Sequence, residues 1–163
     1  MKMLRSALVA LSVLGITAGA VQGQRFGAQV NWGDDVDLGV GARLEIPVAL
    51  ASEGFLAGTF LVASFDYYFP DGPFDYFEFN GNFVAPVNTE SNLNPYVGAG
   101  LNMARWSYDG PGDGASSTDL GLNLLGGIRF LLGSMSSFAE AKFEAGGGEQ
   151  FVLTFGVMFG PNR

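Results

Sequence analysis

The side chains that could do chemistry in this sequence are charged groups spaced two residues apart. Arg43 is followed by Glu45, and a later run carries Glu140, Lys142 and Glu144. In a β-strand, residues two apart point to the same face, so each run would bring opposite charges together on one face. Two chemistries fit such an arrangement: ion pairing inside a protein, or acid–base catalysis by a pair of carboxylates.

The residue types that are missing exclude most catalytic alternatives. The 163 residues contain no His and no Cys, which excludes a Ser-His-Asp triad, a thiolate zinc site and a disulfide. The Gly-rich triplets at 39–41 and 98–100 lack the third glycine of a nucleotide fingerprint. The acidic stretch 109–119 has Pro111 where a calcium loop needs an oxygen ligand, which favours a solvated loop. We therefore expect no catalytic site, no metal site and no cofactor.

Charge and composition narrow the class of protein. Sixteen acidic residues face eight basic ones, and the net charge of −8 argues against nucleic-acid binding. Charged residues form only 15% of the chain and apolar residues form 48%, which is an unusual balance for a soluble domain. The aromatic content of 13% excludes a disordered chain.

The first 23 residues have the pattern of a secretory signal peptide. Lys2 and Arg5 precede an apolar run at 7–18, and small residues at 18–20 or 21–23 offer cleavage sites. The apolar run is too short for a membrane-spanning helix, which takes about 20 residues. We expect this segment, residues 1–23, to direct export and to leave one domain, residues 24–163.

Alternation of apolar and polar residues dominates the rest of the chain and predicts β-strands. Eight such segments are separated by clusters of Gly, Pro, Asn, Asp and Ser, which are typical of hairpin turns. They lie at about 24–33, 36–47, 55–69, 76–87, 95–107, 118–131, 137–145 and 150–159. In the third segment Phe60 and Val62 share the parity of Ser64 and Asp66, which indicates a β-bulge there.

The alternation leaves open which face of the strands points inward. A soluble barrel would bury its apolar face, whereas a membrane barrel turns that face to lipid and its polar face to the lumen. Glycines on the polar face, such as Gly27, Gly41 and Gly127, would make room for charged side chains in a narrow lumen. The polar face also mixes acids and bases that can pair when desolvated. Both features favour the membrane barrel.

Aromatic residues gather at the ends of the predicted strands, as expected for girdles at the two membrane interfaces. A general preference of aromatics for strands does not account for that clustering. The residues assigned to the girdles are Trp32, Tyr67, Tyr76, Trp106, Tyr108, Phe130, Phe138 and Phe159.

Four segments resemble strands of the small outer-membrane barrels of the OmpA, OmpX and OmpW kind. They are residues 94–102, 125–130, 138–143 and 154–159, and the last is similar to the C-terminal targeting signal of such proteins, although Gly160–Arg163 follow it. The strand pattern and the resemblance together predict an all-β fold: an eight-stranded antiparallel up-and-down transmembrane β-barrel. The resemblance implies a monomer in the bacterial outer membrane. Its implied partners are outer-membrane lipid, lipopolysaccharide and, during biogenesis, the barrel-assembly machinery.

Three functions remain open at this point. The first is a structural or anchoring barrel whose lumen is filled by an ion-pair network of Arg43, Glu45, Glu78, Arg129, Glu140 and Lys142. The second is a small passive pore for water, ions or small solutes, and the third is a soluble lipocalin-like carrier. Because strands six and seven form a hairpin, we expect Arg129 to lie near Glu140 on the periplasmic side. Both termini are expected on that side, with short external loops at 34–35, 70–75, 108–117 and 146–149.

Overall fold

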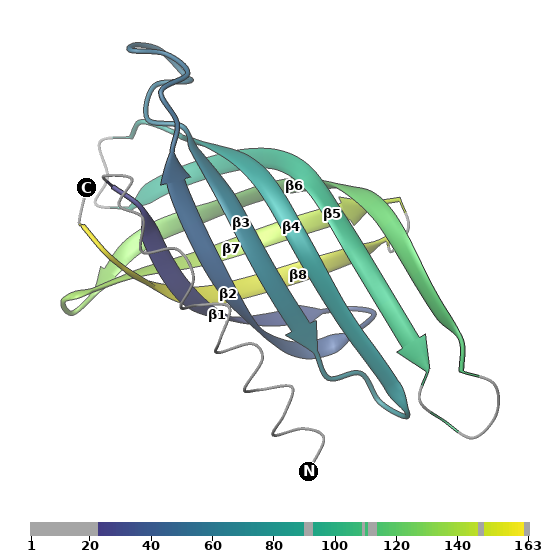
Figure 1. Ribbon diagram of the computed structural model, residues 1–163. Coiled ribbons are helices and arrows are strands. Elements are labelled where there is room, and N and C mark those ends of the chain that lie inside the picture. The colour runs from purple at the N-terminus through teal and green to yellow at the C-terminus, as the bar shows by residue number, and fades with distance from the viewer. Residues whose placement is uncertain (1–22, 90–92, 109, 111–113, 147–148, 162–163) are drawn as a thin grey trace.

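The chain folds into a closed barrel of eight antiparallel strands (Figure 1). The computed structural model describes residues 23–89, 93–108, 110, 114–146 and 149–161. The strands are β1 (Arg25–Gly33), β2 (Asp37–Pro47), β3 (Phe60–Tyr68), β4 (Phe74–Pro86), β5 (Asn94–Tyr108), β6 (Ser116–Leu132), β7 (Met135–Ala145) and β8 (Gln150–Phe159). Each strand pairs with its neighbours in the sequence, and β1 pairs with β8, so the sheet closes without a free edge.

Burial alternates along the strands because successive side chains point into and out of the barrel. On β1 the polar Gln29 and Asn31 are buried. Val30, which lies between them, and Trp32, which follows them, are exposed. β8 shows the same strict alternation along nearly its whole length. The apolar side chains therefore cover the outer wall and the polar side chains line the interior, which is the inverse of a soluble barrel.

The two ends of the barrel differ in their connections. We call the end with the start of β1 and the end of β8 the terminal end, and the other the opposite end. At the terminal end a two-residue turn joins β6 to β7, with Gly133 in the left-handed region at φ 65°. At the same end the connection 48–59 projects beyond the barrel wall (Figure 1).

The third strand departs from the sequence-based prediction in two ways. It begins at Phe60 rather than at residue 55, because 55–59 belong to the projecting connection. The expected β-bulge is wrong: pairing with β2 and β4 runs without interruption from Phe60 to Tyr68. Phe60 and Val62 face inward because an apolar cluster fills that part of the interior. Every other strand begins and ends within two residues of its prediction.

Some sequence-based predictions fall on residues that the structure does not describe. Residues 1–22 of the predicted signal peptide lie outside the described residues, as do 109 and 111–113 of the acidic stretch. Within the described part of the chain, no helix has the length and hydropathy needed to cross a membrane.

Candidate functional site in the barrel interior

The polar side chains of all eight strands meet in the interior of the barrel and form the candidate site. Most of them are buried even though many carry a formal charge. Each end of the interior also holds an apolar cluster. The cluster at the terminal end is Phe60, Val62, Val84, Tyr96 and Leu125, and the one at the opposite end is Val36, Tyr68, Tyr76 and Ala104. The interior is therefore packed with side chains along its length.

Nearest the terminal end is a group that we call the arginine cluster: Arg25, Arg43, Glu45, Arg129 and Glu140. Glu45 is its centre. One of its carboxylate oxygens lies 2.9 Å from Arg129 Nη2 and 3.2 Å from Arg43 Nε, and the other lies 3.8 Å from Arg25 Nη1. Arg43 continues the chain of contacts through Nη1, which lies 3.0 Å from Glu140 Oε2. The hydroxyl of Tyr96 donates to the same oxygen at 2.9 Å.

Two of these guanidinium groups also stack on aromatic rings. The central carbon of Arg129 lies 3.9 Å from the centroid of the Phe60 ring, and that of Arg43 lies 4.3 Å from the Phe138 ring. A cation over an aromatic face is attracted by the electron density of the ring, and more strongly where water is excluded. The rings therefore hold the arginines in place between the ion pairs.

The sequence-based expectation for Arg129 needs a correction. Its ion-pair partner is Glu45 on β2, across the barrel, and Glu140 on the adjacent strand pairs with Arg43 instead. In the β6–β7 ladder Arg129 lies opposite Phe138, and Glu140 lies opposite Gly127. The hairpin between β6 and β7 therefore predicts the level of both residues along the barrel axis. It does not predict their partners, since the side chains reach across the lumen.

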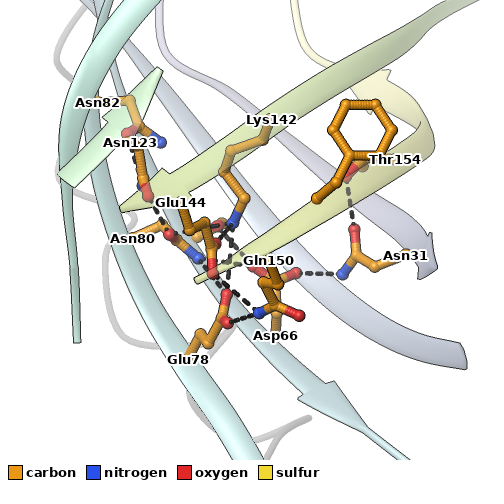
Figure 2. Close-up of polar contacts among 12 residues, drawn as sticks. Asn31, Asp66, Glu78, Asn80, Asn82, Asn123, Lys142, Glu144, Gln150 and Thr154 are labelled. Carbon is orange, nitrogen blue, oxygen red and sulfur yellow. Dashed lines mark hydrogen bonds and ion pairs between the residues drawn. The ribbon is translucent and has the colours of Figure 1, made fainter. Parts of the chain in front are cut away.

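Toward the opposite end is a second group that we call the lysine cluster: Glu78, Lys142 and Glu144 (Figure 2). Lys142 Nζ lies 2.5 Å from Glu144 Oε1 and 3.3 Å from Glu78 Oε2. The side-chain amide of Gln150 donates to both carboxylates, at 2.6 Å to Glu78 and 2.8 Å to Glu144. Glu78 and Lys142 therefore belong to a cluster of their own, separate from the arginines with which they were grouped in the sequence-based network.

Asp66 on β3 is a buried carboxylate held by neutral donors, and it was not assigned to the network from the sequence. One oxygen accepts from the amides of Gln29 and Asn31, both at 2.6 Å. The other accepts from Ser64 at 2.8 Å and from Asn80 at 3.2 Å. No ion pair to Asp66 exists among the described residues. Four hydrogen bonds satisfy this carboxylate, as a buried charge requires.

Asparagines between the charged clusters connect strands that are not neighbours in the sheet. The amide of Asn123 on β6 donates to the side-chain oxygens of Asn80 at 2.8 Å and Asn82 at 2.9 Å, both on β4 (Figure 2). Asn80 also accepts from Lys142 at 3.2 Å. These amides were missed from the sequence, although alternating Asn residues on the polar face of the β4 segment were a usable signal.

Glycines let the large interior side chains fit, as the sequence suggested. A Cβ atom on Gly41 would stand 1.9 Å from an oxygen of Asp66, and one on Gly127 would stand 2.5 Å from the Tyr96 hydroxyl. Real Cβ atoms do not approach other atoms so closely. The absence of a side chain at these positions is therefore a condition for the polar packing opposite them.

The predicted aromatic girdles need a correction as well. Tyr76 and Phe138 are fully buried in the interior, and Trp106 packs against the inner apolar cluster with its ring 4.3 Å from that of Tyr76. Trp32 and Phe159 are exposed on the outer wall. The remaining three, Tyr67, Tyr108 and Phe130, are partly exposed. Position near a strand end fixes the height of a residue, whereas the parity of its position decides which face it occupies.

The interior side chains can form ion pairs and hydrogen bonds with one another across the lumen. Three arginines against two glutamates give the arginine cluster a formal charge of +1. One lysine against two glutamates gives the lysine cluster −1, and Asp66 adds a further −1. Among the described residues, no group of three or more acidic side chains is arranged to hold a metal ion.

The fold is that of the small eight-stranded barrels of bacterial outer membranes. The chain is similar to the N-terminal β-barrel domain of Pseudomonas aeruginosa OprF, with a TM-score of 0.66 and 15% identity, over 83% of this chain and 95% of that one. It is also similar to Neisserial surface protein A (NspA), with a TM-score of 0.59 and 17% identity, over 83% and 94% of the two chains. A third similar structure is the outer membrane enzyme PagL, with a TM-score of 0.50 and 13% identity over 82% and 96%. No protein-family model and no curated protein matches the sequence.

Proposed function

We propose that the protein is a structural or anchoring barrel of the bacterial outer membrane, without enzymatic activity and with a lumen closed by its own side chains. The observation that carries this proposal is the pair of charged clusters that connect opposite walls of the barrel. The similarity in fold to outer-membrane barrels supports the location.

The outer wall supports a lipid environment over the soluble-carrier alternative. Leu101, Leu122 and Leu124 point outward from the middle of their strands and are at least 60% exposed. Large apolar side chains cover this wall from β1 to β8, far more than a soluble monomer leaves exposed to water. A hydrocarbon surround removes that cost, because the apolar face then contacts lipid.

The contacts inside the lumen support a closed barrel. Arg43 and Glu140 pair between β2 and β7, and Arg129 and Glu45 pair between β6 and β2. Their side chains are buried, with Arg129 the most exposed of the four at 19%. An ion that passed through would have to break these pairs, and separating a buried pair costs several kcal/mol. We therefore expect no steady conductance from the folded protein.

A small passive pore is the second candidate, and a different observation favours it. Several buried side-chain oxygens in the middle of the lumen have no protein partner among the described residues, including those of Gln29, Asn102 and Asn123. Buried polar atoms of this kind are usually satisfied by water. Water between the two charged clusters would leave these clusters and the apolar clusters at the two ends as the barriers to ions.

Planar-bilayer recordings separate the two candidates. The closed-barrel proposal predicts near-zero conductance for the wild type and openings after Arg43→Ala, which removes the contact between β2 and β7. Asp119→Asn, which removes a charge at the rim and leaves both clusters intact, is the control and should stay closed. A steady, cation-selective current from the wild type would contradict the proposal and support the pore.

A further inference from the structure

Arg105 has an unusual place among the basic residues of the domain. Residues 24–163 contain six of them: Arg25, Arg43, Arg105, Arg129, Lys142 and Arg163. Four of these lie in the lumen clusters, and Arg163 is outside the described residues. Arg105 is thus the one described cation on the outer wall of a chain with a large excess of acidic residues.

The geometry around Arg105 is ordered. Its neighbour in β5, Ala104, faces the interior, so Arg105 points outward, where it is exposed. The guanidinium donates through Nη1 to Thr118 Oγ1 at 3.0 Å and through Nη2 to Ser116 Oγ at 3.3 Å. Both hydroxyls lie on β6, where Thr118 is paired with Arg105 in the ladder and Ser116 is paired with Ser107. Arg105 makes no ion pair with any described acidic residue.

The three side chains form a donor group that lacks an acceptor of matching charge. Each hydroxyl accepts from the guanidinium and keeps its own O–H free to donate. The guanidinium is planar and has further N–H groups, a geometry that suits the oxygens of a phosphate.

The height of the group on the barrel identifies the environment. Outward side chains on β6 are apolar at Leu120 and Leu122, and those on β5 are apolar at Leu101 and Met103. The next outward residues toward the opposite end are Thr118 on β6 and Arg105 on β5. Arg105 therefore stands where the apolar band of the outer wall stops, which is the level of lipid headgroups for a barrel in a bilayer.

We propose that Arg105, Thr118 and Ser116 bind the phosphate of an anionic lipid headgroup at the opposite end of the barrel. The inference rests on the proposed membrane location and adds to it a specific lipid contact. A lipid phosphate is favoured over a soluble one because acidic residues of this rim, such as Asp75 and Asp119, repel free anions. The acyl chains of a lipid hold its phosphate at the site against that repulsion.

The test uses the folded, full domain in phosphatidylcholine vesicles that contain either phosphatidic acid or diacylglycerol with the same acyl chains. The readout is the thermal unfolding midpoint, followed by heat-modifiable gel mobility, together with the affinity for added phosphatidic acid. Phosphatidic acid should raise the midpoint of the wild type, and diacylglycerol should not. Arg105→Gln should weaken the affinity by about tenfold or more, the effect of losing a charge-assisted hydrogen bond. The affinity of Arg105→Lys should lie between those of the wild type and Arg105→Gln, because an ammonium group keeps the charge without the planar geometry of the guanidinium.

Two controls test whether the position of the lost positive charge matters and whether the phosphate must belong to a lipid. Arg163→Gln removes the same charge elsewhere in the chain and should leave the effect of phosphatidic acid intact. Inorganic phosphate added to diacylglycerol vesicles should not raise the midpoint. Equal responses of the wild type and Arg105→Gln, or an equal response to inorganic phosphate, would overturn the headgroup site.

The location and the site fail in distinguishable ways. A wild type that does not float with phosphatidylcholine vesicles overturns both proposals at once. A wild type that floats but responds equally to phosphatidic acid and diacylglycerol overturns the headgroup site alone.

Discussion

Leu122 lies near the middle of β6, points outward and is 60% exposed, so a charge at this position tests the surroundings of the wall directly. We predict that Leu122→Arg lowers the free energy of unfolding by about 2–4 kcal/mol or prevents insertion, as a cation at the bilayer midplane does. Denaturant titration in vesicles measures the loss. The matched control is Met135→Arg, an outward apolar residue at the rim, where the cost should be about 0–1 kcal/mol. Equal losses at the two positions would count against a bilayer around the barrel.

Removal of Arg43 and removal of Arg129 differ in whether the carboxylate left behind keeps another cation. Arg43 is the only described cation paired with Glu140, whereas Glu45 keeps Arg43 and Arg25 when Arg129 is lost. We predict that Arg43→Ala costs about 3–5 kcal/mol, the cost of breaking a fully buried pair. Arg129→Ala should cost about 1.5–3 kcal/mol, closer to the loss of one charged hydrogen bond. Urea titration of both variants in the same detergent gives the order, and the reverse order would refute the assigned partners.

At the scale of the strands, the approach of β2 to β3 depends on a missing side chain. Gly41→Ala would place a Cβ atom 1.9 Å from Asp66, in the middle of its four hydrogen bonds. We predict a loss of about 1–3 kcal/mol, as for overpacking of a filled interior. Gly81→Ala is the control, because nothing lies within 4 Å of the added atom. Its free energy of unfolding should stay the same or rise slightly. Similar losses for both would contradict packing against Asp66 as the reason that position 41 needs a glycine.

The lysine cluster joins β4 to β7 through a single cation between two carboxylates. Lys142→Met would leave Glu78 and Glu144 facing each other and should destabilise the barrel at neutral pH by like-charge repulsion. The double variant Lys142→Met/Glu144→Gln removes the repulsion and should recover part of the loss. A double-mutant cycle by denaturant titration measures this coupling. Additive losses would show that the cluster does not act as a unit.

The elements of the barrel follow closely from local patterns in the sequence. A period of two and clusters of turn residues specify strands and hairpins, and both are local properties. The exception is the start of β3, where the apolar residues Phe55 and Leu56 read as strand but lie in a projecting connection. Parity also identified the lumen side of Arg43, Glu78 and Lys142, which the structure places inside.

The partners in the interior could not be predicted in the same way. Arg43 and Glu140 are 97 positions apart, and Arg129 and Glu45 are 84 apart. Their contact depends on how the sheet closes on itself, which is a property of all eight strands together. The partners of Asp66 could not be predicted for a related reason, since its donors come from β1, β3 and β4 and none of them carries a charge. Ion-pair logic alone does not find such a site.

The proposed location requires that the outer wall of the barrel contact hydrocarbon. The chain has no cysteine, so a single Cys can be introduced and spin-labelled without removing any other. Suitable positions are Leu120, Leu122 and Leu124 on the exposed face of β6, with Ser116 beyond the apolar band as the reference. Labels there leave the packed interior undisturbed.

The decisive measurement is the accessibility of these four labels to oxygen and to a water-soluble nickel complex, with the protein in phosphatidylcholine vesicles. We predict that oxygen reaches the labels at 122 and 124 best and that the nickel complex reaches them least, because oxygen concentrates in hydrocarbon. The label at 116 should show the opposite preference. Equal access of the nickel complex to all four positions would contradict a membrane-embedded barrel.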